Sequence, residues 1–182
     1  MRFPIVFACL VAVLAAPLSS QETPRPYAGD EKREIKALSA EEIESYRAGA
    51  GMGFAKAAEL NHFPGPKHVL ELASEIGLDA SQRKEAQRIY EAMHAQTVGL
   101  GERVVVSERG LDGLFAAATV DEASLARSVR EIARLQGEVR LEHLRAHLAM
   151  RSLLTAAQVA KYDALRGYGS GAADHDPARH GH

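Results

Sequence analysis

The sequence predicts an all-α protein, built on a long antiparallel helical hairpin with shorter flanking helices, and three observations support this prediction. Ala, Leu, Glu and Arg dominate the 182 residues, and only 5% of the residues are aromatic, a composition that favours helices. Apolar residues recur at steps of three and four along two long segments, residues 80–115 and 122–153, as helices in a bundle require. No segment alternates apolar and polar residues between turns, as a half-buried strand would.

The first segment, residues 1–20, has the pattern of a secretory signal peptide. Arg2 precedes an apolar run over residues 3–18, and polar residues begin at Ser19. The run is too short for a bilayer span, so we expect cleavage near its end and no stable membrane span afterwards. The only cysteine, Cys9, lies in this segment, so the mature chain has none. Export predicts a periplasmic location.

A flexible lead, residues 21–38, and an N-terminal helical extension, residues 39–63, are expected next. Prolines and a glycine favour flexibility in the lead. Ser39 and Glu42 fit a capping box, which predicts a helix at the start of the extension. Alternating glycines follow within residues 49–53. Since no strand precedes them, they indicate a kink or a close helix contact rather than a phosphate loop.

Helical composition resumes over residues 54–60, and residues 61–66 then interrupt it with two prolines and a glycine. Pro66 suits the first position of a helix, because its missing N–H would have no intrahelical partner there. The apolar pattern predicts that this helix covers residues 66–76, and Gly77 suits its end.

The hairpin consists of the two long segments. Asp79 caps the first of them, residues 116–120 form the turn, and Asp121 or Thr119 caps the second, residues 122–153. Glycines within the first long helix weaken it by roughly 1 kcal/mol each relative to Ala and predict a bend. They are Gly99, Gly101 and Gly110.

The second long helix is apolar on two sides of its C-terminal half. The first side is one stripe of apolar residues: Leu125, Val129, Ile132, Val139, Ala146, Met150 and Leu153. Three leucines lie roughly opposite: Leu141, Leu144 and Leu148. A helix with two apolar sides is usually covered by a second layer or by another subunit, and long amphipathic helices pair readily. We therefore expect a homodimer.

The C-terminal part begins with a short helix that Thr155 caps and that ends at Arg166, before Gly167. The remaining residues, 168–182, are rich in Gly, Ala, Asp and His, and we expect a disordered tail. Such a tail either binds a metal ion weakly or is simply solvated.

A short pattern that begins a helix occurs twice. It combines a hydrophobic residue, a capping hydroxyl or carboxylate, and a glutamine three residues after the cap. The first copy is Leu78, Asp79 and Gln82, and the second, an L-T-x-x-Q motif, is Leu154, Thr155 and Gln158. With the export signal and the helical pattern, these motifs make residues 66–166 resemble the Spy/CpxP family of small periplasmic proteins. We place the LTxxQ-type helical domain at residues 64–167.

The resemblance implies a helical hairpin that pairs as a curved dimer. Some members of this family are ATP-independent chaperones that cradle partly unfolded envelope proteins. Another regulates an envelope-stress sensor kinase, and relatives described as heavy-metal sensors bind transition metals. The resemblance thus implies a chaperone-like protein, with a metal sensor and a partner of a sensor kinase as alternatives. Residues 31–63, which include the expected extension, have no counterpart in this pattern.

A transition-metal site is the sharpest chemical hypothesis. His143 and His147 are four residues apart and share one helix face with Met150, a set that suits zinc, copper or nickel. Two histidines are only half of a zinc site, so a facing side chain such as His94 has to complete it. The alternative is a pair of buried histidines that are hydrogen-bonded in an interface.

A client-binding surface is expected where arginines flank the second apolar side of the long helix. Arginine stems cover apolar area while their charged heads attract acidic segments of unfolded chains. The candidate residues are Leu141, Leu144, Leu148, Arg140, Arg145 and Arg151.

Two function classes are disfavoured by composition and motifs. The formal net charge of −2 argues against a nucleic-acid binder that depends on positive charge. Neither a nucleophile elbow nor an H-E-x-x-H motif is present, and the mature chain has no cysteine nucleophile. We therefore do not expect an enzyme.

Overall fold

The computed structural model describes residues 26–168, so the expected signal peptide and all but the first residue of the expected tail lie outside the described residues. The fold is all-α, as predicted, with no strand between residues 26 and 168. In chain order the elements are the 3-10 turn η1 (Asp30–Lys32), α1 (Ala40–Arg47), α2 (Lys56–Glu59), α3 (Pro66–Glu71), α4 (Ala80–Ala116), α5 (Glu122–Leu153) and α6 (Ala156–Arg166). Each described helix is too short or too polar for a transmembrane span.

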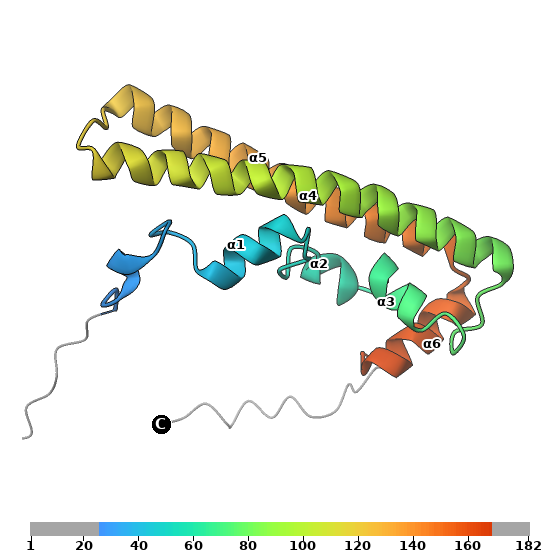
Figure 1. Cartoon of the computed structure of the whole chain (residues 1–182). Coiled ribbons are helices and arrows are strands. Elements are labelled where there is room, and N and C mark those ends of the chain that lie inside the picture. The colour runs from blue at the N-terminus through green and yellow to red at the C-terminus, as the bar shows by residue number, and fades with distance from the viewer. Residues whose placement is uncertain (1–25, 169–182) are drawn as a thin grey trace, which may run out of the picture.

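Helices α4 and α5 form the predicted hairpin and lie side by side along their length (Figure 1). The carboxylate of Asp79 accepts a hydrogen bond from the backbone N of Gln82, 2.8 Å away, at the start of α4. At the start of α5, Asp121 accepts one from the backbone N of Ser124, 2.7 Å away, so Asp121 rather than Thr119 is the cap. Both helices begin where capping chemistry predicts.

The N-terminal segment forms a second layer along one face of the hairpin. Figure 1 shows α1, α2 and α3 in a row beneath the two long helices. The capping box of α1 is present, with Ser39 Oγ accepting from the backbone N of Glu42. Helix α2 is shorter than the expected residues 54–60. Helix α3 ends at Glu71 rather than at residue 76, because the following residues form turns that bury further apolar side chains.

Helix α6 closes one end of the hairpin. The hydroxyl of Thr155 accepts a hydrogen bond from the backbone N of Gln158 at its start. Gly167 ends it in a left-handed conformation, with φ of 76°. Tyr168, the first residue of the expected tail, is half-buried against the adjoining core, so the ordered fold extends at least one residue further than predicted.

Two clusters of buried side chains account for most of the core. The first lies where α3 and α6 meet the open end of the hairpin and consists of Val69, Ile76, Ala86, Ile89, Met93, Ala146, Met150, Leu154, Val159 and Tyr162. The second lies beneath the middle of the hairpin and consists of Ile35, Leu38, Ile43, Tyr46, Val104, Val105, Leu135 and Val139. Val129, expected in the buried stripe, is largely exposed nearer the hairpin turn.

The prediction of a flexible lead does not hold for residues 26–38, the part of the lead that the structure describes. Ile35 is 0% exposed and, together with Leu38, belongs to the second core cluster. An ion pair joins Glu34 to Arg109 of α4, with 2.7 Å between the charged atoms. Burying two large apolar side chains contributes about 1.5–3 kcal/mol each, which offsets the entropy lost when this segment is ordered. Prolines nearby in the sequence therefore do not decide its conformation.

The expected bend in α4 is also corrected, because the helix continues without a break through Gly99, Gly101 and Gly110. One of them, Gly101, is buried where the C-terminal end of α1 crosses α4. A Cβ atom at this position would collide with the backbone carbonyl of Tyr46. The glycine therefore permits close contact between the two layers and does not bend the helix.

Candidate functional site

Two histidines of α5 lie within the buried stripe that faces α4 and the second layer. His143 is 4% exposed and His147 is 8% exposed. The buried residues of this helix are Ile132, Leu135, Val139, His143, Ala146, His147 and Met150. Polar rings in such surroundings need partners, because a buried polar atom without a hydrogen bond costs about 1–3 kcal/mol.

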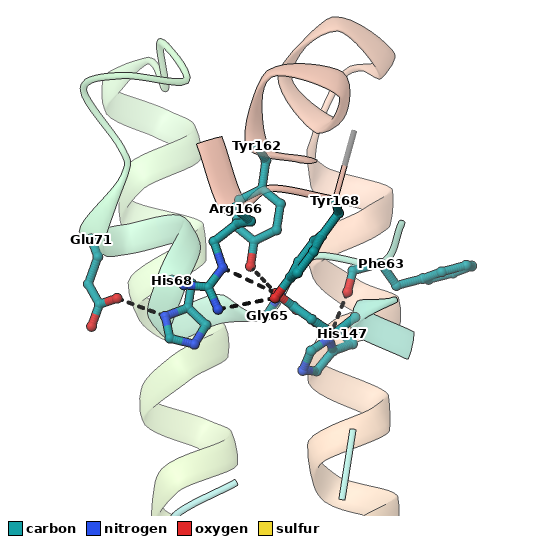
Figure 2. Close-up of polar contacts among 9 residues, drawn as sticks. Phe63, Gly65, His68, Glu71, His147, Tyr162, Arg166 and Tyr168 are labelled. Carbon is teal, nitrogen blue, oxygen red and sulfur yellow. Dashed lines mark hydrogen bonds and ion pairs between the residues drawn. The ribbon is translucent and has the colours of Figure 1, made fainter. Parts of the chain in front are cut away.

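His147 has its partners in the loop between α2 and α3. Its Nδ1 atom lies 2.7 Å from the backbone O of Phe63, as Figure 2 shows, and 3.6 Å from Oε2 of Glu59. A Cβ atom on Gly65 would lie 2.9 Å from Cε1 of His147, so glycine is required for this packing. His147 thus joins the second layer to the hairpin, as the hydrogen-bonded alternative predicts.

His143 is only partly satisfied. Phe54 stacks on its ring, with centroids 6.3 Å apart and planes inclined by 20°. Its Nε2 atom is buried without a hydrogen-bond partner. Burial lowers the pKa of His143 below its ordinary value, the imidazole of His147 lowers it further, and a hydrogen bond to the backbone of Ala50 partly opposes both. The imidazole is therefore neutral near pH 7.

The structure does not assemble the expected set of metal ligands. Met150 is fully buried in the first core cluster. His94 lines the same cleft as His143 and His147, but its ring stacks on Tyr90 at a centroid distance of 5.6 Å. Between residues 26 and 168, no three His, Cys, Asp or Glu side chains are grouped to hold an ion.

A carboxylate that sequence reasoning missed lies beside these histidines. Glu59 of α2 accepts a hydrogen bond of 2.5 Å from the hydroxyl of Tyr162 on α6 and one of 3.0 Å from the backbone N of Gly65. Its Oε1 atom also lies 3.7 Å from Nε of Arg166. Figure 2 shows Tyr162 and Arg166 pointing from α6 toward Gly65 and His147. No local sequence pattern indicates this hydrogen-bond network, because Glu59 and Tyr162 are 103 positions apart in the chain.

Burial and the bond to this carboxylate raise the pKa of Tyr162 well above its usual range near 10. The phenol therefore stays protonated and keeps donating its hydrogen bond. The guanidinium of Arg166 lies over the ring of Tyr168, 5.6 Å from its centroid. These contacts tie α6 to the second layer.

The two motif glutamines, Gln82 and Gln158, contact each other. Nε2 of Gln82 donates to Oε1 of Gln158 over 2.9 Å, and Nε2 of Gln158 donates back to Oε1 of Gln82 over 2.8 Å. Each also reaches the backbone next to the other motif, at Leu153 and Gly77. The motif therefore does more than cap helices, because the pair joins the start of α4 to the start of α6.

The expected client-binding residues remain on the outer surface of α5. Leu148 is 59% exposed and Leu141 is 38% exposed, while Leu144 is half-buried. Arg145 lies between them along the helix and forms an ion pair of 2.6 Å with Glu142. The other two candidate arginines differ in exposure: Arg140 is exposed and Arg151 is half-buried.

The comparisons with known proteins agree with this architecture. The model of the LTXXQ motif family matches residues 66–166, the stretch that runs from the start of α3 to the end of α6. Comparisons with curated proteins and with solved structures find no match. The family includes the periplasmic proteins of the Spy/CpxP type. Because the match covers more than half of the chain and contains both glutamine motifs, the chain belongs to the LTXXQ motif family.

Proposed function

We propose that this protein is a periplasmic, ATP-independent chaperone-like protein that binds partly unfolded envelope proteins. The proposed binding surface is the row of leucines on the outer side of α5. Three residues one helical turn apart form this leucine row: Leu141, Leu144 and Leu148. Family membership supports the class of protein, and the exposure of this row supports the site.

The observation that carries the proposal is the exposure of Leu141 and Leu148. The second layer covers the other side of α5, where His143 and His147 are buried, so the extension leaves the leucine row uncovered. Exposed apolar side chains at a spacing of three and four form a continuous strip, which suits transient apolar contacts. Arginines beside such a strip add attraction for acidic segments.

A light-scattering assay of a chemically denatured enzyme tests the proposal. We expect the purified protein to slow aggregation at an equimolar ratio without ATP. The double variant Leu141→Ser/Leu148→Ser should lose at least roughly half of this effect, because few residues carry most of a binding surface. Leu165→Ser is the matched control, since Leu165 is also exposed but lies on α6.

Either of two results contradicts the proposal. The first is that the unchanged protein does not slow aggregation. The second is that the double variant and the Leu165→Ser control are equally active. Sedimentation of the same samples measures the oligomeric state. A homodimer that dissociates in the double variant would indicate that the leucine row is a subunit interface instead.

The alternatives from the sequence have their own tests. A metal sensor would bind zinc, copper or nickel with defined stoichiometry, and His143→Ala/His147→Ala would abolish that binding in a calorimetric titration. A regulator of a sensor kinase would retain one periplasmic receptor domain in pull-down experiments and bind unfolded clients weakly. Neither alternative draws on the leucine row.

A further inference from the structure

The second layer buries much less apolar surface over residues 50–63 than over the residues before them. Four large apolar side chains of residues 35–46 are buried: Ile35, Leu38, Ile43 and Tyr46. Between residues 50 and 63 only Ala55 is buried, Phe54 is half-buried, and Leu60 is 58% exposed. Little apolar burial is therefore lost when this stretch moves away from the hairpin.

Buried side-chain polar atoms without hydrogen bonds are gathered beneath the same stretch. Between residues 26 and 168 there are three of them: Nε2 of His143, Oδ1 of Asp163 and Nε of Arg166. Each of these side chains contacts a residue from 50–63, and the ring of Phe54, for example, stacks on that of His143. The closed position of the stretch thus keeps these atoms from water without supplying partners, a cost that opening would remove.

Two polar contacts hold the stretch against α6. The hydroxyl of Tyr162 donates a hydrogen bond of 2.5 Å to Oε1 of Glu59. Further along the chain, Nδ1 of His62 lies 2.8 Å from Oδ2 of Asp163. We call these two contacts the latches. Since the stretch has few apolar contacts, the latches contribute much of what keeps it closed.

The two ends of the stretch are fixed, whereas strained residues lie inside it. A Cβ atom on Gly49 would lie 2.6 Å from Oγ1 of Thr97 on α4, and Pro64 is fully buried. Between these ends, Met52 and His62 have left-handed backbones, with φ of 43° and 66°, which side chains other than glycine disfavour. The stretch can therefore move between two fixed points, and movement relieves strain.

A cleft of about 520 Å³ lies between this stretch and the hairpin. The loop at residues 48–53 forms one wall, and Met93 of α4 contributes to the floor. Met93 is only 8% exposed, so the closed stretch leaves this part of the floor with almost no contact with solvent. The volume is sufficient for a small molecule.

We propose that residues 50–63 form a strap that opens as a unit and controls access to the floor of the cleft. The latches hold the strap closed, and its ends at Gly49 and Pro64 stay in place when it opens. The rest of the fold is retained, because neither core cluster includes a buried residue of the strap. The leucine row lies on the outer side of α5, so the strap controls a different surface from that of the proposed function.

Chemical labelling of single cysteines measures the opening. Residues 21–182 contain no cysteine, so Met93→Cys and Ile89→Cys each introduce one thiol into the mature chain. Both residues belong to α4 and are 8% exposed, but Ile89 does not line the cleft. We expect DTNB to label Met93→Cys about tenfold faster than Ile89→Cys, because local opening requires less free energy than global unfolding. Equal labelling rates would overturn the proposal.

A latch variant distinguishes an opening strap from a cleft that is permanently accessible. Glu59→Gln removes the charge that Tyr162 bonds to, so it should speed the labelling of Met93→Cys about fivefold and leave Ile89→Cys unchanged. Glu102→Gln is the control, because Glu102 pairs with Arg47 outside the strap, and it should change neither rate. If Glu59→Gln has no effect, or accelerates both thiols equally, the strap does not control access.

Hydrogen exchange of the unchanged protein gives an independent test that does not depend on the folding of any variant. The backbone amides of Leu60 and Phe63, which are hydrogen-bonded within the strap, should exchange through an opening that depends little on urea. The amides of Val104 and Val139, which lie in the core, should exchange only through global unfolding. Exchange of the strap amides by global unfolding alone would also overturn the proposal.

Discussion

Gly101 lies at a close contact between the two layers of the molecule, where an added Cβ atom would meet the backbone of Tyr46. It lies in the middle of a 37-residue helix, where glycine costs about 1 kcal/mol relative to alanine. The cost is offset because the backbone at Tyr46 reaches α4 at a point where no side chain fits. Gly99 and Gly110 lie in the same helix, and an added Cβ atom at either would meet no other atom within 4 Å.

Substitution of these glycines should therefore change stability in opposite directions. Gly101→Ala should lower the free energy of unfolding by about 1–3 kcal/mol, because backbone atoms must move apart to accept the new Cβ atom. Gly99→Ala should raise it by about 0.5–1 kcal/mol, because the helix gains propensity and meets no obstacle. Urea denaturation measures both, and a destabilised Gly99→Ala protein would contradict this explanation.

His143 should make stability depend on pH between about 5.5 and 7.5. The folded state holds the pKa of His143 below its ordinary value, so the unfolded chain binds a proton at a higher pH than the folded chain does. Stability is therefore greatest above the unfolded pKa near 6.5 and falls as the pH decreases through it, by at most about 1.4 kcal/mol per pH unit.

The variant His143→Gln should flatten this part of the stability curve, which denaturation at several pH values measures. The carboxylates of the capping boxes titrate at lower pH, because hydrogen bonds lower the pKa values of Glu42, Asp79 and Asp121. Their contribution is lost only in more acidic solution. An unchanged slope in His143→Gln would show that another group dominates this range.

At the scale of the elements, the two glutamine motifs, at the starts of α4 and α6, act together. Each glutamine completes the capping box of its own helix and also donates to the other glutamine. The first turns of α4 and α6 are thereby fixed relative to each other. The capping box of Asp121 and Ser124 at the start of α5, by contrast, has its bonds within its own turn.

A double-mutant cycle should detect this pairing. Gln82→Ala and Gln158→Ala should each reduce stability, and their effects should be non-additive by about 1 kcal/mol, because either change removes the shared hydrogen bonds. The control cycle combines Gln82→Ala with Ser124→Ala, which should add within about 0.5 kcal/mol. Equal coupling energies in the two cycles would show that the contact between the glutamines contributes nothing.

At the scale of the whole molecule, the N-terminal segment is part of the fold and not an appendage. It supplies half of the second core cluster, the partners of both buried histidines, and Glu59 beneath α6. The hairpin alone would expose the stripe that contains His143 and His147. The segment therefore decides which side of α5 is available to a partner.

Ile35→Ala should test this role, because the residue lies before the first α-helix yet is completely buried. We expect a loss of about 2–5 kcal/mol in the free energy of unfolding, as for other large-to-small changes in a core. Tyr27→Ala is the control in the same segment, since Tyr27 is 78% exposed. If both variants unfold at the same denaturant concentration as the unchanged protein, the segment is not integrated into the core.

Local chemistry predicted most of the helix boundaries. The caps at Ser39, Asp79, Asp121 and Thr155 lie where side chains satisfy the first free backbone N–H groups, and such bonds involve only neighbouring residues. The burial of Thr97 was missed because it is polar, although its hydroxyl hydrogen-bonds to the backbone. Thr97 lies four residues after Met93 and so continues the buried stripe of α4. This spacing is the sequence signal from which its burial could have been predicted.

The sequence by itself determined that this protein is a helical hairpin with shorter helices and two glutamine motifs, because periodicity and capping are short-range properties. Only the tertiary structure decided how the second layer lies on the hairpin. That arrangement brings Glu59 to Tyr162, leaves Nε2 of His143 unpartnered and keeps Leu148 exposed. These outcomes depend on contacts between residues far apart in the chain, for which neither composition nor spacing contains a local signal.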